Sequence, residues 1–348
     1  MESVVGVWRE AVDRLAPVPP AQRASFLDLP PTREAHADAH AQVAAFHEIE
    51  LQQPTSAPQS VATLRIAAWN LERCLYPEEA ARILQRNRVD LTLLTEMDVG
   101  VLRTGQMHTI GLVAAQLGQG YCYALEFLEL VPMPPPAGFP EHGSGNAEGF
   151  HGNGIVSSVP MEAPVVIRLD EMADWYIAPS GQQRRIGNRM AVAATFTCGA
   201  ARFVACSVHL ENRTDGAGRA TQMRTLLDAL DVYAGALPVV IGDDLNTRVS
   251  AGRHDDMSEP LFAMAAARGY DWSACNLAQP TTRTSTWSQG EGTRQLDWFC
   301  TRGLKVRDPA VVPALGEDAS VLSDHELIVV TLELASAQST EGGMQFTR

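Results

Sequence analysis

The chain has 348 residues, of which 45% are hydrophobic and 20% are charged, as is ordinary for a soluble globular protein. This length fits one large α/β domain with extensions. The formal net charge is −14, and the only lysine is Lys305, so the chain lacks the general basic character of proteins that hold nucleic-acid backbones. Arginines could still form a local basic face; the candidates are Arg184, Arg185, Arg213, Arg219 and Arg224.

Neither a membrane span nor a secretory signal is expected. The chain has no apolar run of about 18 residues, and its first residues mix acids and arginines with apolar side chains. Its 6 cysteines are scattered and form no CxxC pair, so their spacing indicates neither a zinc site nor a redox site. These features predict a cytoplasmic protein without stable membrane insertion.

Residues 1–61 are predicted to form a helical N-terminal extension. Apolar residues recur with helical spacing over residues 4–15, and a second helical stretch covers residues 32–53. His36 and His40 are four residues apart and therefore share one helix face. We expect that face to be solvated, because no acidic or cysteine ligand is fixed nearby that would make it a metal site. A linker rich in Pro and Ser then leads to the main domain.

Residues 62–336 are predicted to form the main domain, and residues 337–348 a C-terminal tail. Hairpins and crossovers are mixed, which favours an α/β fold with mixed sheets. A long loop rich in Pro and Gly, at residues 131–152, is of the kind that often shapes specificity. Strands are expected over residues 63–71, 89–97, 121–130, 154–158, 238–247, 294–302 and 325–335, a hairpin over 188–210, and helices over 77–88, 108–118 and 221–235.

Polar side chains recur where these predicted strands end. Each one alone is ordinary, since strands commonly end where the chain meets water, and the pair Asp243–Asp244 could simply form a turn. Together they are more informative, because carboxylates, amides and histidines at one sheet edge suit a hard cation and a phosphate. The set comprises Asn70, Glu72, Glu96, His209, Asp244, Asn246, Asp297, Asp324 and His325.

The motifs NLE, TEMD, VHLEN, GDDLNT, LDWF and SDHELI, in this order, resemble the endonuclease/exonuclease/phosphatase family. The resemblance covers about residues 62–336. It implies two mixed β-sheets packed as a sandwich and flanked by helices, a four-layer α/β/β/α fold. It also implies a phosphoesterase that depends on Mg²⁺ or Mn²⁺.

The resemblance also implies roles for individual residues. Glu96 matches the central metal ligand, and Glu72 and Asp324 are further metal candidates. Asp244 matches the residue that orients or deprotonates the attacking water, and Asn246 would position it. His325 matches the histidine that contacts the scissile phosphate, and Asp297 matches its carboxylate partner.

Four more positions complete the predicted site. Asn70 opens the site beside the metal, and His209 matches the histidine of the family's HL motif near the phosphate. Asn153 and His151 are expected near the substrate, while Arg189 is either structural or substrate-facing. Asp243, where relatives commonly have Gly, is either a turn residue or a partner behind the site.

The resulting prediction is a hydrolase that cleaves a phosphodiester of small-molecule, nucleotide or lipid-headgroup type by in-line attack of a water activated by an Asp. The acidic charge favours a small-molecule phosphoester over nucleic acid. The alternatives are a DNA or RNA endonuclease or exonuclease of the same family, and a binding module that has lost catalysis.

Overall fold

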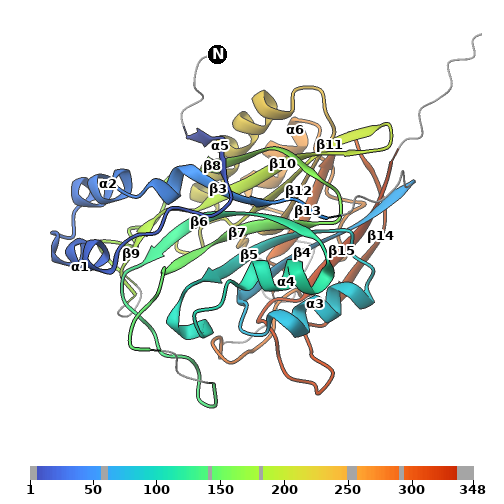
Figure 1. The fold of residues 1–348 in the computed structure, drawn as a ribbon. Helices are drawn as coiled ribbons and strands as arrows, with labels where there is room; N and C mark the ends of the chain where they lie inside the picture. Colours follow the sequence, from blue (N-terminus) through green and yellow to red (C-terminus); the bar gives the residue numbers. More distant parts are fainter. Residues whose placement is uncertain are drawn as a thin grey trace, which may run out of the picture.

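The computed structural model describes residues 6–55, 62–139, 143–179, 183–248, 257–289 and 294–334. Two mixed sheets form its centre (Figure 1). The predicted tail at 337–348 and part of the predicted linker lie outside the described residues.

The larger sheet has nine strands. Eight follow the order β14-β15-β4-β5-β7-β6-β3-β2, and β9 pairs with β6. Strands β4 and β5 run parallel, as do β2 and β3, whereas the other pairs are antiparallel. The strands are β2 (Glu10–Val12), β3 (Glu48–Gln52), β4 (Thr63–Arg73), β5 (Leu91–Val99), β6 (Gly120–Glu129), β7 (Phe150–Ser157), β9 (Arg185–Gly187), β14 (Lys305–Val312) and β15 (Leu327–Glu333).

The smaller sheet has six strands in the order β1-β8-β10-β11-β12-β13. Here β11 and β12 are parallel and the remaining pairs are antiparallel. The strands are β1 (Val7–Trp8), β8 (Met161–Arg168), β10 (Met190–Cys198), β11 (Ala201–Val208), β12 (Val239–Asp244) and β13 (Asp297–Arg302).

Helices cover the outer faces of both sheets, which confirms the predicted sandwich. Helices α3 and α4 pack on the larger sheet, and α5 and α6 on the smaller one (Figure 1). The helices are α1 (Pro20–Asp28), α2 (Arg33–Ala41), η1 (Ala44–His47), α3 (Pro77–Arg86), η2 (Leu102–Thr104), α4 (Thr109–Leu117), α5 (Gly216–Ala234) and α6 (Pro260–Ala267).

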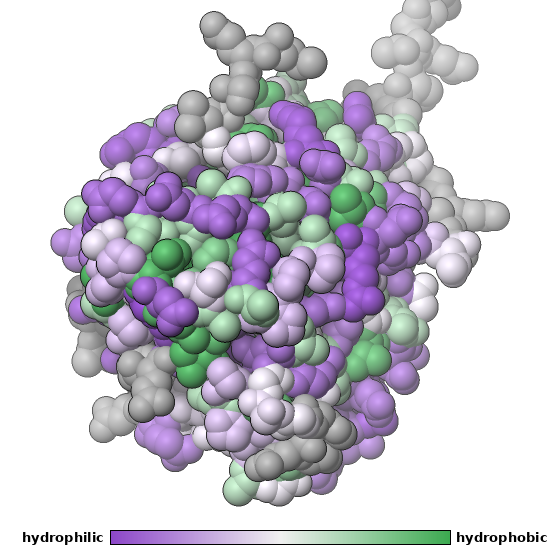
Figure 2. Space-filling model, turned by 60° about the vertical axis from the view of Figure 1, so that its left-hand side comes forward, coloured by the Kyte–Doolittle hydropathy of each residue, from purple (hydrophilic) through white to green (hydrophobic). Residues whose placement is uncertain are grey.

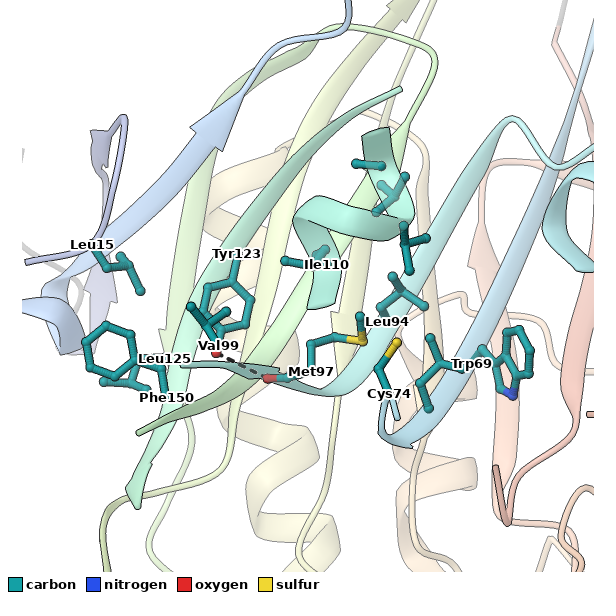
Figure 3. Close-up of a cluster of buried hydrophobic side chains, with 14 of the residues drawn as sticks. Leu15, Trp69, Cys74, Leu94, Met97, Val99, Ile110, Tyr123, Leu125 and Phe150 are labelled. Carbon is teal, nitrogen blue, oxygen red and sulfur yellow. Dashed lines mark hydrogen bonds between the residues drawn. The ribbon is translucent and has the colours of Figure 1, made fainter. Parts of the chain in front are cut away.

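Alternation along β4 explains how one strand serves two cores. Leu64 and Ile66 face the smaller sheet, where they pack in the core between the sheets. Ala67 and Trp69 face the other way, into the core under α3 and α4. Figure 3 shows part of this outer core around Trp69. The dashed line in Figure 3 is a buried hydrogen bond, in which the Tyr123 hydroxyl donates to the carbonyl of Met97 at 3.2 Å.

The N-terminal segment joins both sheets, and the prediction of a helix over residues 4–15 is wrong. Within it, β1 pairs with β8 and β2 pairs with β3, which in turn pairs with β6. The end of the second predicted helix, at 48–52, is strand β3 rather than helix. Helical spacing was overridden because these residues complete sheet edges whose partners lie far along the chain. The segment does contain helices, α1 and α2, of which only α2 lies in a predicted stretch.

The two histidines of α2 are not on a solvated face, so that expectation is also wrong. His36 is buried, and its Nε2 accepts a hydrogen bond from the backbone N–H of Gly187 at 3.0 Å. His40 stacks on Phe46 with ring centroids 4.1 Å apart. Burial, with Arg168 nearby, lowers the pKa of His40 to about 3. Both histidines therefore help to dock α2 on the sheet.

The face drawn in Figure 2 is mainly hydrophilic, with hydrophobic residues in small separate groups. Among the described residues, no helix is both long enough and apolar enough to cross a membrane.

Candidate active site

Two neighbouring parallel strands of the larger sheet bring Asn70 and Glu96 together. In their register Asn70 lies opposite Thr95, and the regular pairing is interrupted just beyond this point. Glu96 itself has a positive φ of 56°, and Glu72 has one of 44°. Such conformations cost energy in residues other than glycine and are typical of functional sites. The distortion lets the Asn70 amide donate to Glu96 Oε1 at 3.2 Å.

The smaller sheet delivers Asp244 to the same place. The preceding Gly242 permits this, because a Cβ atom there would lie 2.6 Å from the ring of Phe299 and 2.9 Å from Leu93. With glycine, β12 approaches the larger sheet closely. The Asn70 amide then donates to Asp244 Oδ2 at 3.1 Å and so joins the two sheets.

Asn246 fixes the orientation of Asp244. Its backbone N–H donates to Asp244 Oδ1 at 2.8 Å, and its side-chain amide donates to Asp244 Oδ2 at 3.2 Å. The same amide donates to the carbonyl of Leu210 at 3.0 Å. Leu245, between the two polar residues, is buried in the core. Asp244 is thereby held by three donors from two residues on its two oxygens.

His325 and Asp297 form a buried pair beside Asp244. His325 Nδ1 lies 3.0 and 2.9 Å from the two oxygens of Asp297, and its Nε2 lies 3.7 Å from Asp244 Oδ2. Burial alone would lower the pKa of His325, but the carboxylates of Asp297, Asp324 and Asp244 raise it well above its usual value. These carboxylates therefore favour the imidazolium form of His325. Thr281, absent from the predicted set, donates to Asp297 Oδ2 at 2.5 Å.

His209 lies on the other side of Asp244, with its Nε2 3.4 Å from Asp244 Oδ2. Its Nδ1 lies 2.8 Å from a guanidinium nitrogen of Arg189. Because a guanidinium only donates, Nδ1 accepts, and the ring proton sits on Nε2, toward Asp244. Arg189 is in turn held by Glu126 at 3.2 Å and Glu211 at 3.4 Å. Arg189 is thus fixed by carboxylates and also lines a cavity that contains Glu96, so both of its predicted roles stay open.

The charge of Asp244 follows from these neighbours. Burial favours its protonated form, but His325 and His209 hold its pKa below the usual value. Asp244 is therefore a carboxylate, oriented by amides and flanked by two imidazoles. A carboxylate in this state can accept a proton from water.

Glu72, Glu96 and Asp324 form an acidic group beside this network. Glu72 accepts from the hydroxyl of Ser285 at 2.6 Å and from the backbone N–H of Asp324 at 3.2 Å. Burial and the charge of Asp324 raise the pKa of Glu72 to about 7. Burial raises the pKa of Asp324 as well, with Glu96 adding to it. Burial opposes the charge of Glu96, but Arg73 and His151 hold its pKa below the usual value.

A divalent cation fits this acidic group. Its donors are carboxylate oxygens, with the Asn70 carbonyl oxygen nearby, which is the ligand type that Mg²⁺ and Mn²⁺ prefer. The mutual repulsion that raises the pKa of Glu72 is what a bound cation would relieve. Glu96, already charged, is the strongest ligand candidate.

Among the described residues, the group with metal-like spacing of its donor atoms is a different one. Donor atoms of Asp244, Asp297 and His325 all lie within 4.8 Å of one another. Metals bind neutral imidazole, whereas the carboxylates around His325 favour its imidazolium form, with Nδ1 against Asp297.

The two remaining predicted residues differ in their surroundings. His151 Nδ1 lies 2.7 Å from Asp98, which also binds Arg103 through both of its oxygens at 2.8 Å. His151 also lines a cavity that contains Glu96. Asn153 is fully buried, and its amide donates to the carbonyl of Met190 at 3.3 Å. Within the described residues it makes no hydrogen bond to the other predicted site residues.

Asp243 is neither a surface turn nor a hydrogen-bonded partner. It is fully buried, with a φ of 111°, and neither of its oxygens has a hydrogen-bond partner among the described residues. Burial and the nearby charges of Asp297 and Asp244 raise its pKa well above the usual value. Asp243 is therefore a buried carboxyl group behind the site whose surroundings favour its neutral form.

Comparisons with known proteins agree with this architecture. A model of the Endonuclease/Exonuclease/phosphatase family matches residues 67–325. No curated protein matches the chain by sequence. Among solved structures, an endonuclease/exonuclease/phosphatase from Beutenbergia cavernae is similar with a TM-score of 0.54 and 18% identity, over 80% of this chain and 73% of the other.

Two further structures show the same similarity. The human Nocturnin catalytic domain with bound sulfate anion has a TM-score of 0.54 and 16% identity, over 79% of this chain and 94% of the other. A family protein from Bacteroides thetaiotaomicron has a TM-score of 0.52 and 15% identity, over 79% and 98%. At these identities the similarity establishes the fold alone.

Proposed function

We propose that this chain, which belongs to the Endonuclease/Exonuclease/phosphatase family of hydrolases acting on phosphoester bonds, hydrolyses a small phosphodiester with a water molecule activated by Asp244. One observation carries the proposal. A charged Asp244 from one sheet shares the Asn70 amide with Glu96 from the other sheet. A proton acceptor and a metal-ligand candidate are thus fixed side by side.

The proton chemistry follows from the hydrogen bonds of the chain. Asp244 accepts a proton from the attacking water, and Asn246 keeps its oxygens in the orientation for doing so. His325 offers its Nε2 proton to a phosphate oxygen as negative charge builds there, while Asp297 holds the ring at Nδ1. His209 presents a second N–H on the opposite side of Asp244.

Mg²⁺ or Mn²⁺ is the proposed cofactor, held by Glu96 with Glu72 and Asp324. When bound, such an ion draws charge from a phosphoryl oxygen and helps the leaving oxygen to depart. Asn70 orients the Glu96 carboxylate through its amide. Ser285 and Ser288 orient the other two acids, through hydrogen bonds of 2.6 Å to Glu72 and 2.5 Å to Asp324.

A small-molecule substrate is favoured over nucleic acid. The net charge is −14, and two arginines that could have built a basic face are otherwise engaged. Arg184 donates to the carbonyls of Tyr176, Leu27 and Leu29, and Arg219 is buried against Glu259. A grip on long nucleic-acid backbones needs several free basic side chains on one surface.

We also propose a cytoplasmic location. All 6 cysteines are buried and none forms a disulfide. Free buried thiols are typical of a reducing compartment.

The test compares two substrates, bis(p-nitrophenyl) phosphate and supercoiled plasmid DNA, with MgCl₂, MnCl₂ or EDTA. The variant is Asp244→Asn, and the matched control is Asp38→Asn, on the exposed side of α2. The proposal expects metal-dependent cleavage of the small diester that Asp244→Asn lowers by roughly 10²–10³ and Asp38→Asn leaves unchanged. Plasmid nicking that is lost only in Asp244→Asn would instead make the protein a nuclease. Cleavage of neither substrate would overturn diester hydrolysis.

A further inference from the structure

A polar cavity adjoins the acidic group. Its volume is about 190 Å³, and its wall includes Glu96, Arg73, His151, Arg185 and Gln183. Pockets for drug-sized ligands are larger, about 300–1,000 Å³, and mostly apolar. This cavity therefore suits one compact polar group rather than a nucleobase or an acyl chain.

Four arginines line the cavity, and two of them are engaged by carboxylates. Arg103 binds Asp98 and Glu129, at 2.8 and 3.2 Å. Arg189 is held by Glu126 and Glu211, as described above. These two guanidiniums are each fixed by two close carboxylates, although Arg189 Nε has no hydrogen-bond partner among the described residues.

Within the described parts of the chain, Arg185, unlike Arg103 and Arg189, is not held by a close pair of carboxylates. It is 8% exposed, yet its Nε has no hydrogen-bond partner among the described residues, and its nearest carboxylate oxygen, on Glu129, is 3.8 Å away. Among the described residues its side chain donates one hydrogen bond, a long one of 3.4 Å to Gln183. The guanidinium is packed over the rings of Trp175 and Phe127, at 4.4 and 4.7 Å. A buried cation with free donors is costly unless something pairs with it.

Arg73 is the second cavity arginine whose Nε has no hydrogen-bond partner and that no carboxylate holds closely among the described residues. It has a positive φ of 75°, directly after the strained Glu72, and its buried Nε also lacks a partner in the described parts of the chain. Its guanidinium lies 5.2 Å from the ring centre of Trp287. No carboxylate within salt-bridge distance holds it among the described residues. Burial lowers the pKa of Arg185; Glu129 opposes this, and the charges of Arg103, Arg189 and Arg73 lower it further.

We propose that Arg73 and Arg185 form a subsite for a second phosphate group of the substrate, so that the substrate is a phosphoester carrying another phosphate close to the bond that is cleaved. This inference rests on the proposed function, which places the cleaved group at Glu96. Guanidiniums present paired N–H groups that match phosphate oxygens. The acids in the wall do not oppose this, since Glu129 accepts from Arg103 and Glu96 belongs to the metal group.

The test measures the binding of inorganic phosphate to metal-free protein in EDTA by isothermal titration calorimetry. Because Glu96 lines both the cavity and the catalytic centre, the loss of binding in the arginine variants is what assigns the phosphate to the cavity. The variants are Arg185→Met and Arg73→Met, and Arg185→Lys keeps the charge. The control is Arg213→Met, an exposed arginine at 4.6 Å from the Trp175 ring centre that does not line the cavity.

We expect each Met variant to weaken phosphate binding about tenfold or more, because a charge-assisted hydrogen bond is worth about 1.5–3 kcal/mol and 1.4 kcal/mol is tenfold. Arg185→Lys should retain part of the affinity, and Arg213→Met all of it. No binding by wild type, or equal binding by wild type and both Met variants, would overturn the subsite. Because this assay needs no catalysis, it stays decisive even if the enzyme cleaves neither test substrate. Thermal melting shows whether each variant is folded. If Arg185→Met does not fold, the comparison of wild type with Arg73→Met tests the subsite.

Discussion

Replacing Asp297 by Asn should move the alkaline limit of activity to lower pH. Asp297 contacts His325 Nδ1 with both oxygens and is buried. Removing one partner of a buried ion pair costs about 3–5 kcal/mol. One pKa unit corresponds to about 1.36 kcal/mol, and Asn keeps one acceptor, so the lower end of that range gives a fall of about two units in the pKa of His325.

The sign follows from the direction of the shift. The carboxylates raise the pKa of His325, so they extend the pH range over which the wild type keeps its imidazolium. In Asp297→Asn the ring loses its proton at lower pH, and activity should fall earlier as pH rises. The loss relative to wild type should therefore grow with pH, to a limit of about 10² for a fall of about two pKa units.

The assay is the pH dependence of kcat/KM from pH 5 to 10, with saturating MgCl₂ and bis(p-nitrophenyl) phosphate. His325→Gln is the companion variant, because it removes the titrating group and should abolish the alkaline limb altogether. The reasoning is refuted if Asp297→Asn lowers the rate by the same factor at every pH and leaves the alkaline limb in place.

Three further predictions concern stability and metal binding. Asp243→Asn should become increasingly stabilising above about pH 4 in EDTA, since the folded protein holds the Asp243 proton that the unfolded chain releases there. Urea unfolding from pH 4 to 8 measures this. Free energies of unfolding that change with pH in the same way for wild type and variant would contradict it. Arg103→Met should lower the free energy of unfolding by about 3–5 kcal/mol, because Asp98 and Glu129 lose their buried partner, and a change below 1 kcal/mol in urea unfolding would count against this. Glu96→Gln should weaken Mg²⁺ binding by at least about tenfold in calorimetry, and unchanged affinity would remove Glu96 from the metal group.

Much of the sheet sandwich was predictable because its strands are marked locally. The apolar run before Asp244 and the alternating apolar residues at the start of β4 indicate buried strands. The polar residues at the ends of these strands are easily recognised among apolar neighbours. The structure brings Asn70, Glu96 and Asp244 into hydrogen-bonding distance across the two sheets. The meeting of Asn70 with Glu96 could be predicted because β4 and β5 are parallel neighbours that end at the same sheet edge, whereas Asp244 comes from the other sheet.

The N-terminal strands could not be predicted in the same way. Val7 and Trp8 pair with Ile167 and Val166, more than 150 positions away, and no local pattern announces a partner at that distance. Helical spacing was the stronger local signal, and tertiary pairing overrode it.

The polar wall of the cavity was also hidden from the sequence. Arg185 was visible as part of an arginine cluster, but nothing nearby in the sequence shows that it is buried and free while Arg184 binds backbone carbonyls. Arg73 follows Glu72 directly, and only its strained backbone reveals where it lies. Which arginines are free depends on acids that come from distant strands.

The most direct test of the central claim is a Mg²⁺ titration of metal-stripped protein, reading p-nitrophenol release from bis(p-nitrophenyl) phosphate for wild type and Asp244→Asn. The account predicts no rate in EDTA, a saturable rise with Mg²⁺ in the wild type, and a plateau lower by roughly 10²–10³ in the variant. A wild-type rate that is independent of metal, or an equal plateau in Asp244→Asn, would contradict it.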